Sequence, residues 1–319
     1  MSKLNERRHA LSLMGASLLA AGLSTKAFAQ PARELRIGFQ KYGTLTILKG
    51  RGTLEQRLAE KNITVKWTEF PAGPVLLEGL NVGSIDFGTV GEAPPIFAQA
   101  AGANLVYVGH EPPSPKTEAI VVPKGSTLRT LADLRGKKIA VNKGSNAHYL
   151  LVKALEKAGI AYTDVQVVFL APSDARAAFE RGAIDAWSIW DPFLAAAEKQ
   201  LGARVLADGT GLVANHQFYL AARPYAEKQS EIVAIVLDEL AKVDAWGKTH
   251  PAEVAAILAR QTGLDLPVVE LAASRYSYGV TPLSPAVISQ QQAIADTFTR
   301  LKLIPTSIVV KDAQLASRP

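Results

Sequence analysis

The sequence of 319 residues contains no cysteine, and this absence removes several classes of chemistry. A disulfide, a thiolate zinc site, a cysteine nucleophile and a lipid-modified cysteine all require the missing residue. Glycine, with 24 residues, and proline, with 18, have ordinary shares, and no segment is of low complexity. With 48% hydrophobic and 20% charged residues, the composition is typical of a globular protein and not of a disordered chain.

The sequence also lacks runs of lysine and arginine. The formal net charge is +6, but Lys3, Arg7, Arg8 and Lys26 lie in the N-terminal segment, so the rest of the chain is only mildly basic. This gives nucleic-acid binding no support and weakly favours anionic solutes. No segment reaches the roughly 18 apolar residues that a membrane-spanning helix needs.

The common catalytic motifs are missing as well. The sequence has no Gly-x-Ser-x-Gly elbow, no His-Glu-x-x-His, no Gly-x-x-x-x-Gly-Lys phosphate loop and no Gly-x-Gly-x-x-Gly after a strand. His110, His216 and His250 have neither metal-ligand spacing nor a visible partner, so we interpret them as structural. We therefore expect no catalytic residue, no metal and no cofactor.

The first residues predict a secretory signal peptide. A basic start precedes an apolar stretch at 10–23, and a small-x-small sequence follows at 27–29. This order indicates cleavage after Ala29, whereas a buried first helix would not explain it. The general and the twin-arginine export routes both stay open, because the residues after Arg7-Arg8 match the twin-arginine motif only loosely. We expect a protein that is free in the periplasm.

Strand and helix patterns alternate along the mature chain. The first series predicts strands at 35–39, 63–70, 85–90 and 105–110 and helices at 53–62, 75–81 and 94–101. The pattern then restarts, with strands at 119–122, 138–142, 165–170 and 184–189 and helices at 131–134, 146–158 and 173–181. The remaining chain has helical patterns at 224–245, 251–260 and 285–301. This order predicts an α/β protein with mostly parallel sheets covered by helices.

A short internal repeat supports two similar lobes. Residues 83–87, Gly-Ser-Ile-Asp-Phe, correspond to residues 182–186, Gly-Ala-Ile-Asp-Ala, and a proline follows each, Pro94 or Pro192. Both copies combine a helix stop, a buried strand and a helix with proline in its first turn. Two such lobes predict a cleft at the carboxyl ends of strands, near helix N-termini.

Three strand-to-helix junctions are unusually small and polar. Together they contribute the candidate residues Gln40, Tyr42 and Thr44, then Thr89, Gly91 and Glu92, then Ser145, Asn146 and His148. Each junction offers backbone N–H groups and the positive end of a helix dipole, which can hold an anion without a metal. Thr44, Thr89 and Ser145 could equally be helix caps when taken singly. Three junctions split across both lobes favour a single anion site.

Further candidates come from the end of one strand and from the C-terminal part. Trp187 is expected in the core, whereas Trp190 stands on the opposite face of the strand end and could pack on a ligand tail. Asp191 is interpreted first as a helix cap. Arg275 could grip an anion or brace the lobes. Glu92 would repel an anion unless it bonds backbone N–H groups, accepts from a ligand amine or points away.

The mature chain resembles the aliphatic sulfonate-binding proteins of ABC importers through essentially its whole length. The segments that carry the resemblance are 35–41, 69–74, 80–86, 94–100, 142–145, 189–192 and 218–223. Taken alone, the Gly-x-Ile-Asp strand entry is shared with relatives that bind taurine, nitrate or pyrimidines.

The resemblance implies a type II periplasmic-binding fold with crossings near 118–122 and 217–221. Residues 1–29 are then the signal peptide, 30–117 and 218–319 form the first lobe, and 118–217 form the second, inserted lobe. The implied function is capture of an alkanesulfonate by a monomer that serves a membrane permease and its ATPase. The resemblance also implies that the ligand sits at the three junctions and at Trp190. Together with Asp191 and Arg275, which the residues alone suggest, the predicted ligand-binding residues are Gln40, Tyr42, Thr44, Thr89, Gly91, Glu92, Ser145, Asn146, His148, Trp190, Asp191 and Arg275.

Other functions on this fold stay open at this point. The ligand could be taurine, nitrate, a sulfate ester or a pyrimidine, and the role could be sensory without transport. An enzyme on the same fold is a further alternative. The type that cleaves carbon–sulfur bonds relies on a cysteine, which this chain lacks.

Overall fold

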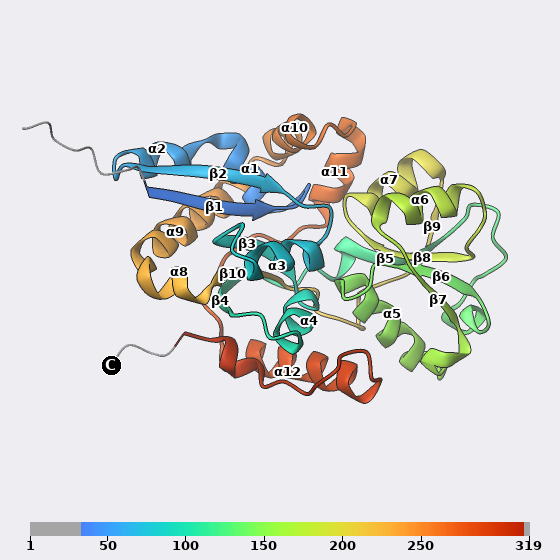
Figure 1. Ribbon diagram of the computed structural model, residues 1–319. Helices are drawn as coiled ribbons and strands as arrows, with labels where there is room; N and C mark the ends of the chain where they lie inside the picture. The colour runs from blue at the N-terminus through green and yellow to red at the C-terminus, as the bar shows by residue number, and fades with distance from the viewer. Residues whose placement is uncertain (1–32, 316–319) are drawn as a thin grey trace, which may run out of the picture. The chain divides into compact units, whose positions relative to one another are not determined.

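A computed structural model describes residues 33–315, and these contain two five-stranded sheets (Figure 1). The predicted signal peptide, residues 1–29, lies outside the described residues. The first sheet has the order β2-β1-β3-β10-β4, built from β1 (Arg33–Phe39), β2 (Ile63–Glu69), β3 (Phe87–Gly91), β4 (Leu105–His110) and β10 (Gln217–Ala222). Strand β1 pairs in parallel with β2 and β3, whereas β10 runs antiparallel between β3 and β4.

The second sheet repeats this plan. Its order is β7-β6-β8-β5-β9, built from β5 (Glu118–Val122), β6 (Lys138–Val141), β7 (Gln166–Phe169), β8 (Ala186–Trp190) and β9 (Arg204–Asp208). Strand β6 is parallel to β7 and β8, whereas β5 is antiparallel to β8 and β9. The antiparallel strand is β10 in the first sheet and β5 in the second. Each is the first strand that the chain forms after it crosses from the other sheet. The predicted α/β architecture is confirmed, with one antiparallel strand added between the parallel ones.

Helices pack against both sheets (Figure 1). The elements of the first sheet alternate with α1 (Thr44–Arg51), α2 (Thr53–Ala59), α3 (Gly73–Asn81) and α4 (Pro94–Ala100), and those of the second with α5 (Asn146–Lys157), α6 (Pro172–Glu180) and α7 (Phe193–Leu201). The C-terminal part adds α8 (Arg223–Lys228), α9 (Ser230–Gly247), α10 (Pro251–Thr262), α11 (Leu266–Ser274) and α12 (Pro285–Arg300). Within residues 33–315, no helix has the length and apolar character to cross a membrane.

Several boundaries differ from the predicted ones for local reasons. The helix predicted at 224–245 is two helices, because Gln229 leaves the helical conformation at φ −124° and ψ 36°. The short helix predicted at 131–134 is a 3₁₀ turn, closed by the reciprocal hydrogen bonds of Thr130 and Asp133. Strand β9 and helix α11 were not predicted. Ser284 caps α12, since its side chain accepts from the N–H of Val287.

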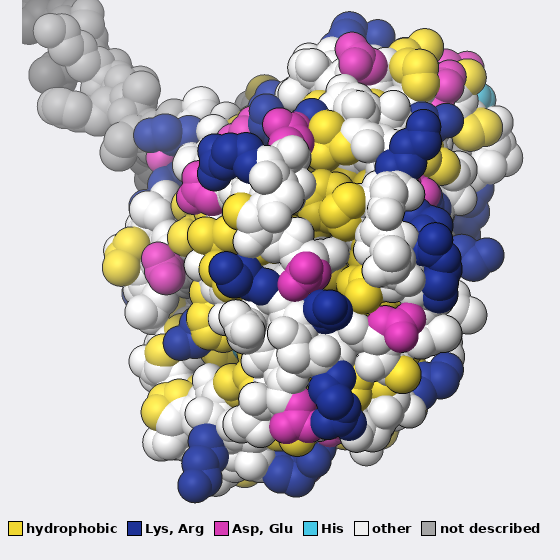
Figure 2. All heavy atoms as spheres, turned by 90° about the vertical axis from the view of Figure 1, so that its right-hand side faces the viewer, with side chains coloured by type: hydrophobic (Ala, Val, Ile, Leu, Met, Phe, Trp, Pro, Cys, Tyr) yellow, Lys and Arg dark blue, Asp and Glu magenta, His cyan; other side chains and the backbone are white. Residues whose placement is uncertain are grey.

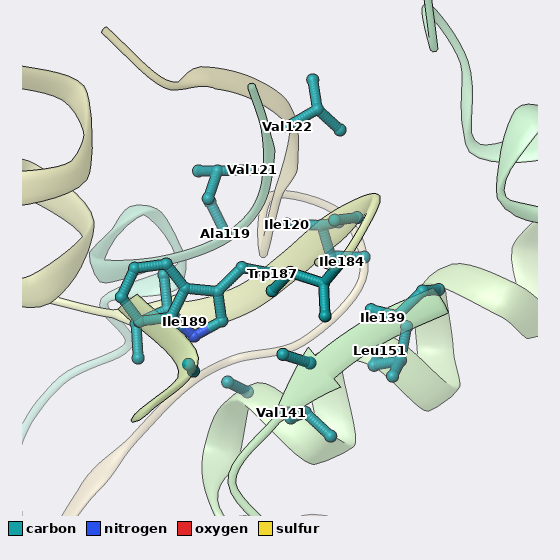
Figure 3. Close-up of a cluster of buried hydrophobic side chains, with 14 of the residues drawn as sticks. Ala119, Ile120, Val121, Val122, Ile139, Val141, Leu151, Ile184, Trp187 and Ile189 are labelled. Atoms are coloured by element: carbon teal, nitrogen blue, oxygen red, sulfur yellow. The ribbon is translucent and has the colours of Figure 1, made fainter. Parts of the chain in front are cut away.

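The core of the second sheet explains why its strands read as continuous apolar runs. Trp187, Ile189, Val121 and Ile139 are at most 1% exposed, and Leu151 of α5 packs with them (Figure 3). Helices cover both faces of such a sheet, so alternation of polar and apolar residues is lost. The predicted core position of Trp187 is confirmed.

Charged side chains of both signs are mixed on the surface. On the face drawn in Figure 2, lysine and arginine side chains gather along one side. Over the rest of this face, acidic and basic side chains are mixed. Exposed pairs such as Arg176–Glu180 and Lys153–Glu156 span one helical turn. Pairs of this kind contribute little stability, so the fold depends mainly on its apolar cores.

Two chain segments connect the sheets, 111–117 after β4 and 209–216 after β9. Asn215 joins them, because its Nδ2 donates to the carbonyl of Ser114 at 3.1 Å and to Oγ1 of Thr117 at 2.8 Å. Asn215 is 1% exposed and has a φ of 52°, a left-handed conformation that asparagine tolerates better than most residues. Asn215 therefore helps to hold the two connections together, beside backbone hydrogen bonds such as that from the N–H of Ser114 to the carbonyl of Ala214 at 3.1 Å.

Candidate functional site

A small polar pocket lies where strand ends and helix N-termini of both sheets meet. Its lining residues come from the β1–α1, β2–α3, β3–α4 and β6–α5 junctions, the end of β8, the second connecting segment and the start of β10: Gln40, Tyr42, Gly73, Gly91, Pro94, Ser145, Asn146, Trp190, Asn215 and Gln217. None of these described side chains carries a formal charge. The three junctions singled out in the sequence therefore do meet in one place.

Six of the predicted site residues line this pocket: Gln40, Tyr42, Gly91, Ser145, Asn146 and Trp190. Sequence reasoning missed Gly73, Pro94, Asn215 and Gln217. Gly73 and Pro94 stand at the beginning of helices and could have been found by the same junction signal. Asn215 and Gln217 arrive through the second connection, and no local pattern marks them.

Gln40 and Tyr42 are held by the loop that follows β1. Gln40 is 6% exposed, and its Nε2 donates to the carbonyl of Thr89 at 3.2 Å, so it links the ends of β1 and β3. The ring of Tyr42 stands edge-on to that of Tyr276, with centroids 5.8 Å apart. Burial raises the pKa of Tyr42 well above its usual value, so the hydroxyl stays protonated and can donate.

Ser145 caps α5 and lines the pocket at the same time. Its hydroxyl donates to the carbonyl of Asn142 at 2.7 Å and accepts from the N–H of His148 at 3.3 Å. The N-terminal amides of this 12-residue helix supply the positive end of its dipole beside the pocket. The two predicted roles of Ser145, helix cap and site residue, are compatible.

Asn146 links the part of the chain that forms the second sheet to the part that forms the first sheet. Its Oδ1 accepts from the N–H of Ala93 at 3.1 Å, and its Nδ2 donates to Oδ1 of Asn215. The amide lies directly on Gly91, where an added Cβ would be 1.9 Å from Nδ2. Only glycine permits this approach, so Gly91 is needed for space rather than for backbone conformation.

Trp190 lines both the polar pocket and a second, mainly apolar cavity. The indole is 8% exposed and stands edge-on to Phe193. Beyond it lies a cavity of about 210 Å³, which shares Gln40, Tyr42 and Trp190 with the pocket and is otherwise lined by Lys41, Glu69, Phe70, Pro71, Pro172, Ser173, Pro192 and Phe193. The arrangement pairs a polar end with an apolar end, as a ligand with a charged head and a hydrophobic tail requires.

Three predicted site residues have structural partners instead. The Thr44 hydroxyl donates to Asp244 Oδ1 at 2.8 Å, and the Thr89 hydroxyl donates to the carbonyl of Phe218 at 3.1 Å. His148 accepts from the N–H of Gly144 through Nδ1 at 3.2 Å, and its Nε2 is 2.7 Å from the Tyr162 hydroxyl. Burial lowers the pKa of His148 to about 4, so it is neutral.

Asp191 and Arg275 contact each other and do not line the pocket. The N-cap of α7 is Pro192 and not Asp191 as predicted, but Asp191 Oδ1, one residue earlier, accepts from the N–H of Ala195 in the first turn at 2.9 Å. Arg275 Nη1 is 3.4 Å from Asp191, and Nη2 pairs with Glu198. Of the two interpretations of Arg275, the structure places it where it braces α7 against α11.

Glu92 faces backbone rather than the pocket. Its Oε2 accepts from the N–H of His216 at 3.1 Å, and its side chain is among the linings of a separate cavity with Tyr149 and Gln290. Burial raises the pKa of Glu92 to about 7. The bond to a backbone N–H, one of three alternatives drawn from the sequence, is the one observed.

The chemistry that this site permits is the binding of a small anion. The pocket offers hydroxyl and amide donors with fixed positions, and no nucleophile lies beside a base among its lining residues. In residues 33–315, no group of three or more His, Cys, Asp or Glu side chains is arranged to hold a metal ion. Neutral donors held by the fold replace the hydration shell of an anion without a cost of reorganisation.

Comparison with known proteins gives close matches over nearly the whole chain. The family model described as NMT1/THI5-like matches residues 59–254. The chain is 45% identical to an aliphatic sulfonates-binding protein of Escherichia coli K12 over 95% of both chains. The solved alkanesulfonate-binding protein of Xanthomonas axonopodis pv. citri, bound to MOPS, is similar with a TM-score of 0.85 and 46% identity over 90% of this chain and 99% of that one. The solved periplasmic aliphatic sulphonate-binding protein of E. coli gives 0.80 and 45% over 90% and 95%.

Proposed function

Because this chain belongs to the family of the aliphatic sulfonate-binding proteins, we propose that it captures alkanesulfonates in the periplasm and delivers them to an ABC importer. The observation that carries the proposal is the pairing of a neutral, donor-lined pocket with an apolar cavity across Trp190. A sulfonate head and an alkyl tail have the same two parts. The relative from Xanthomonas binds a sulfonate, MOPS, whose tail carries a ring.

Capture of this ligand requires no acid or base. A sulfonate stays ionised at any physiological pH, so oriented donors are sufficient to hold it. Tyr42, Asn146 and the first amides of α5 are the donors we assign to the head, and Trp190 with Phe193 the surface for the tail. Each square ångström of tail buried there contributes roughly 25 cal/mol.

We propose that residues 30–117 and 218–319 form one lobe and residues 118–217 the other. The segments 111–117 and 209–216 would then act as the hinge. A ligand that touches Gln40 of one lobe and Ser145 of the other contacts both only when they are closed, so binding favours closure. The closed monomer is the form that a permease with its ATPase would recognise. We propose no catalytic activity, since the lining residues supply no activated nucleophile.

The proposal is tested by calorimetry and thermal shift on the mature protein, refolded free of ligand, in a buffer without sulfonates. The panel holds alkanesulfonates of increasing chain length, MOPS, taurine, sulfate, nitrate and a hydroxymethylpyrimidine. We expect micromolar or tighter binding of the alkanesulfonates. A response to nitrate or pyrimidine alone would keep the binding-protein class and reject the ligand.

Two substitutions locate the site. Trp190→Ala should weaken long-chain alkanesulfonates by about tenfold or more and methanesulfonate much less, because only the long tails cover the indole. Ser145→Ala should weaken all of them, since it changes the head pocket. Ser284→Ala is the matched control, because Ser284 caps α12 in the same way but does not line the pocket. If Ser145→Ala and Ser284→Ala weakened sulfonate binding equally, the effect of Ser145→Ala would come from the lost helix cap and not from the pocket.

A further inference from the structure

Two carboxyl groups behind the pocket are buried without the partners that a charge needs. Glu118 is 0% exposed, and neither of its carboxyl oxygens has a hydrogen-bond partner within the described part of the chain. Glu92 is 1% exposed, and its Oε1 is likewise without one. A buried carboxylate in such surroundings is strongly disfavoured, so both groups are neutral at low pH.

Both carboxyl groups stand directly against lining residues. Glu92 follows Gly91, and its Oε2 accepts from the N–H of His216, between the lining residues Asn215 and Gln217. Glu118 opens β5 opposite Trp190, and residues opposite each other in an antiparallel pair have side chains on the same face. Its charge also bears on the hydroxyl of Tyr42. A negative charge on either group would therefore be close to the anion.

The groups around the two carboxyls do not compensate a charge. Glu92 and Glu118 act on each other, and the pKa of Glu118 is raised well above its usual value, first by burial and then by Glu92. The other titratable groups that face them are Tyr42 from the β1–α1 loop and Tyr149 from α5, with Asp191 also acting on Tyr42. His216 presents its backbone to Glu92, while its ring contacts that of His110 and bonds the carbonyl of Glu111.

We propose that the pocket holds its anion only while Glu92 and Glu118 are protonated, so that ligand and proton bind together. This inference rests on the proposed function, because it takes a sulfonate as the anion. A sulfonate does not titrate in the physiological range, so any pH dependence of its binding comes from the protein. Repulsion between an anion and a nearby carboxylate is strong in a medium of low polarity.

The sign of the effect follows from linkage. Burial raises the pKa of Glu92 to about 7, and a bound anion raises it further, so the complex retains a proton that the free protein releases above this pH. Affinity is therefore constant on the acid side and is lost as the pH rises through 7. For one group of this kind we expect a fall of about tenfold or more between pH 6 and pH 9.

The experiment is isothermal titration of the native protein with a butanesulfonate at pH 6, 7, 8 and 9. Two sulfonate-free buffers of different ionisation enthalpy are used at each pH, so that the heat reports the number of protons taken up. We expect net proton uptake at pH 8 together with the loss of affinity. This readout needs no variant and does not depend on the folding of one.

Variants then assign the protons to residues. Glu92→Gln keeps the shape and neutrality of the protonated acid, so it should flatten the fall between pH 6 and pH 9 while keeping the affinity found at pH 6. Glu118→Gln mimics the protonated acid in the same way and should also keep the affinity found at pH 6. Glu60→Gln, at an exposed position at the end of α2, is the matched control and should keep the fall of the native protein. A folded Glu92→Gln variant that loses affinity with pH as steeply as the native protein, or a folded Glu118→Gln variant that binds much more weakly at pH 6, would overturn the assignment.

The outcomes separate this inference from the function on which it rests. Binding with the same affinity from pH 6 to pH 9 and without proton uptake rejects proton coupling and leaves sulfonate capture intact. Absence of sulfonate binding at every pH rejects the proposed function itself.

Discussion

Gly91 shows how the lack of one side chain determines the contact between the two halves of the chain. The amide of Asn146 occupies the space that a Cβ would fill and bonds Ala93 on one side and Asn215 on the other. The contact therefore joins the end of β3, the beginning of α5 and the second connecting segment. It also leaves the Asn146 amide at the wall of the pocket.

At this scale we expect Gly91→Ala to hinder closure without preventing folding. The new methyl group would lie 1.9 Å from Asn146 Nδ2, so the two halves must separate slightly. Ligand affinity should fall by about tenfold or more, while the free energy of unfolding changes by about 1 kcal/mol or less. Calorimetry and the radius of gyration in saturating ligand measure the two effects. Gly125→Ala is the control, since an added Cβ there meets nothing within 4 Å; native-like affinity of Gly91→Ala would contradict the expectation.

The residue scale also shows what sequence could reveal about the site. Of the small polar residues that follow a strand, Gln40, Tyr42, Ser145 and Asn146 line the pocket. Thr44 has the same local pattern but bonds Asp244, which lies 200 residues away in sequence. Local pattern cannot distinguish a cap from a pocket residue, because the difference depends on distant partners.

At the scale of elements, the contact between α7 and α11 is one of the contacts by which the C-terminal region reaches the second sheet's helices; α12 also packs on α5, where the rings of Phe298 and Tyr149 meet. A small apolar cluster of Ala195, Ala196, Val268 and Ala272 lies between the two helices. Arg275, at the end of α11, adds two ion pairs. One is to Glu198 of α7 and the other is to Asp191, which lies just before this helix. Asp191 is fully buried, so its partner matters more than that of an exposed carboxylate.

We expect Arg275→Met to destabilise the protein by about 2 kcal/mol, because Asp191 would lose its cation while staying buried. The guanidinium does not line the pocket, so short-chain and long-chain sulfonates should weaken by the same factor. Urea unfolding and the ligand panel measure these effects. Arg176→Met breaks an exposed pair within one helix and should cost less than about 0.5 kcal/mol. Selective loss of one ligand class would mean that Arg275 touches ligand after all.

Elements with strong periodicity were predictable, and those without it were not. The buried strands of both series stand within two residues of their predicted starts, because glycine and proline mark their ends. Strand β9 was not predicted because all five of its residues are half-buried. Its sequence therefore shows neither an alternation of polar and apolar residues nor a long apolar run. Gln229 interrupts the helical pattern at 224–245 without a glycine or proline, so the break between α8 and α9 had no local signal.

At the scale of the whole molecule, several buried carboxyl groups shape the pH dependence of stability. Burial raises the pKa of Glu92 and Asp191 to about 7 and that of Glu111 to about 8. An unfolded chain releases these protons near pH 3.8 for Asp191 and near pH 4.5 for the two glutamates, whereas the folded protein keeps them until about pH 7 to 8. Stability is therefore lost as the pH rises through this window.

We expect the midpoint of thermal unfolding, without ligand, to be lower at pH 8 than at pH 5 by about 5 °C. Exposed carboxylates with a lowered pKa, such as Asp133 and Glu156, make the protein more stable as the pH rises. Their titration is complete at a lower pH, so it does not contribute to the difference between pH 5 and pH 8. Calorimetric scans at the two pH values measure the difference, and Glu111→Gln should reduce it. A higher midpoint at pH 8 would contradict the expectation.

The neutral lining of the pocket has a consequence for how ligand binding depends on salt concentration. It presents dipoles and no formal cation, since its described side chains are uncharged and Arg275 is engaged by Asp191 and Glu198. Dipoles act at short range, where dissolved ions cannot enter between the partners to weaken the attraction. Anion binding in this pocket should therefore vary little with salt concentration, whereas binding to an exposed arginine would weaken as the salt concentration rises.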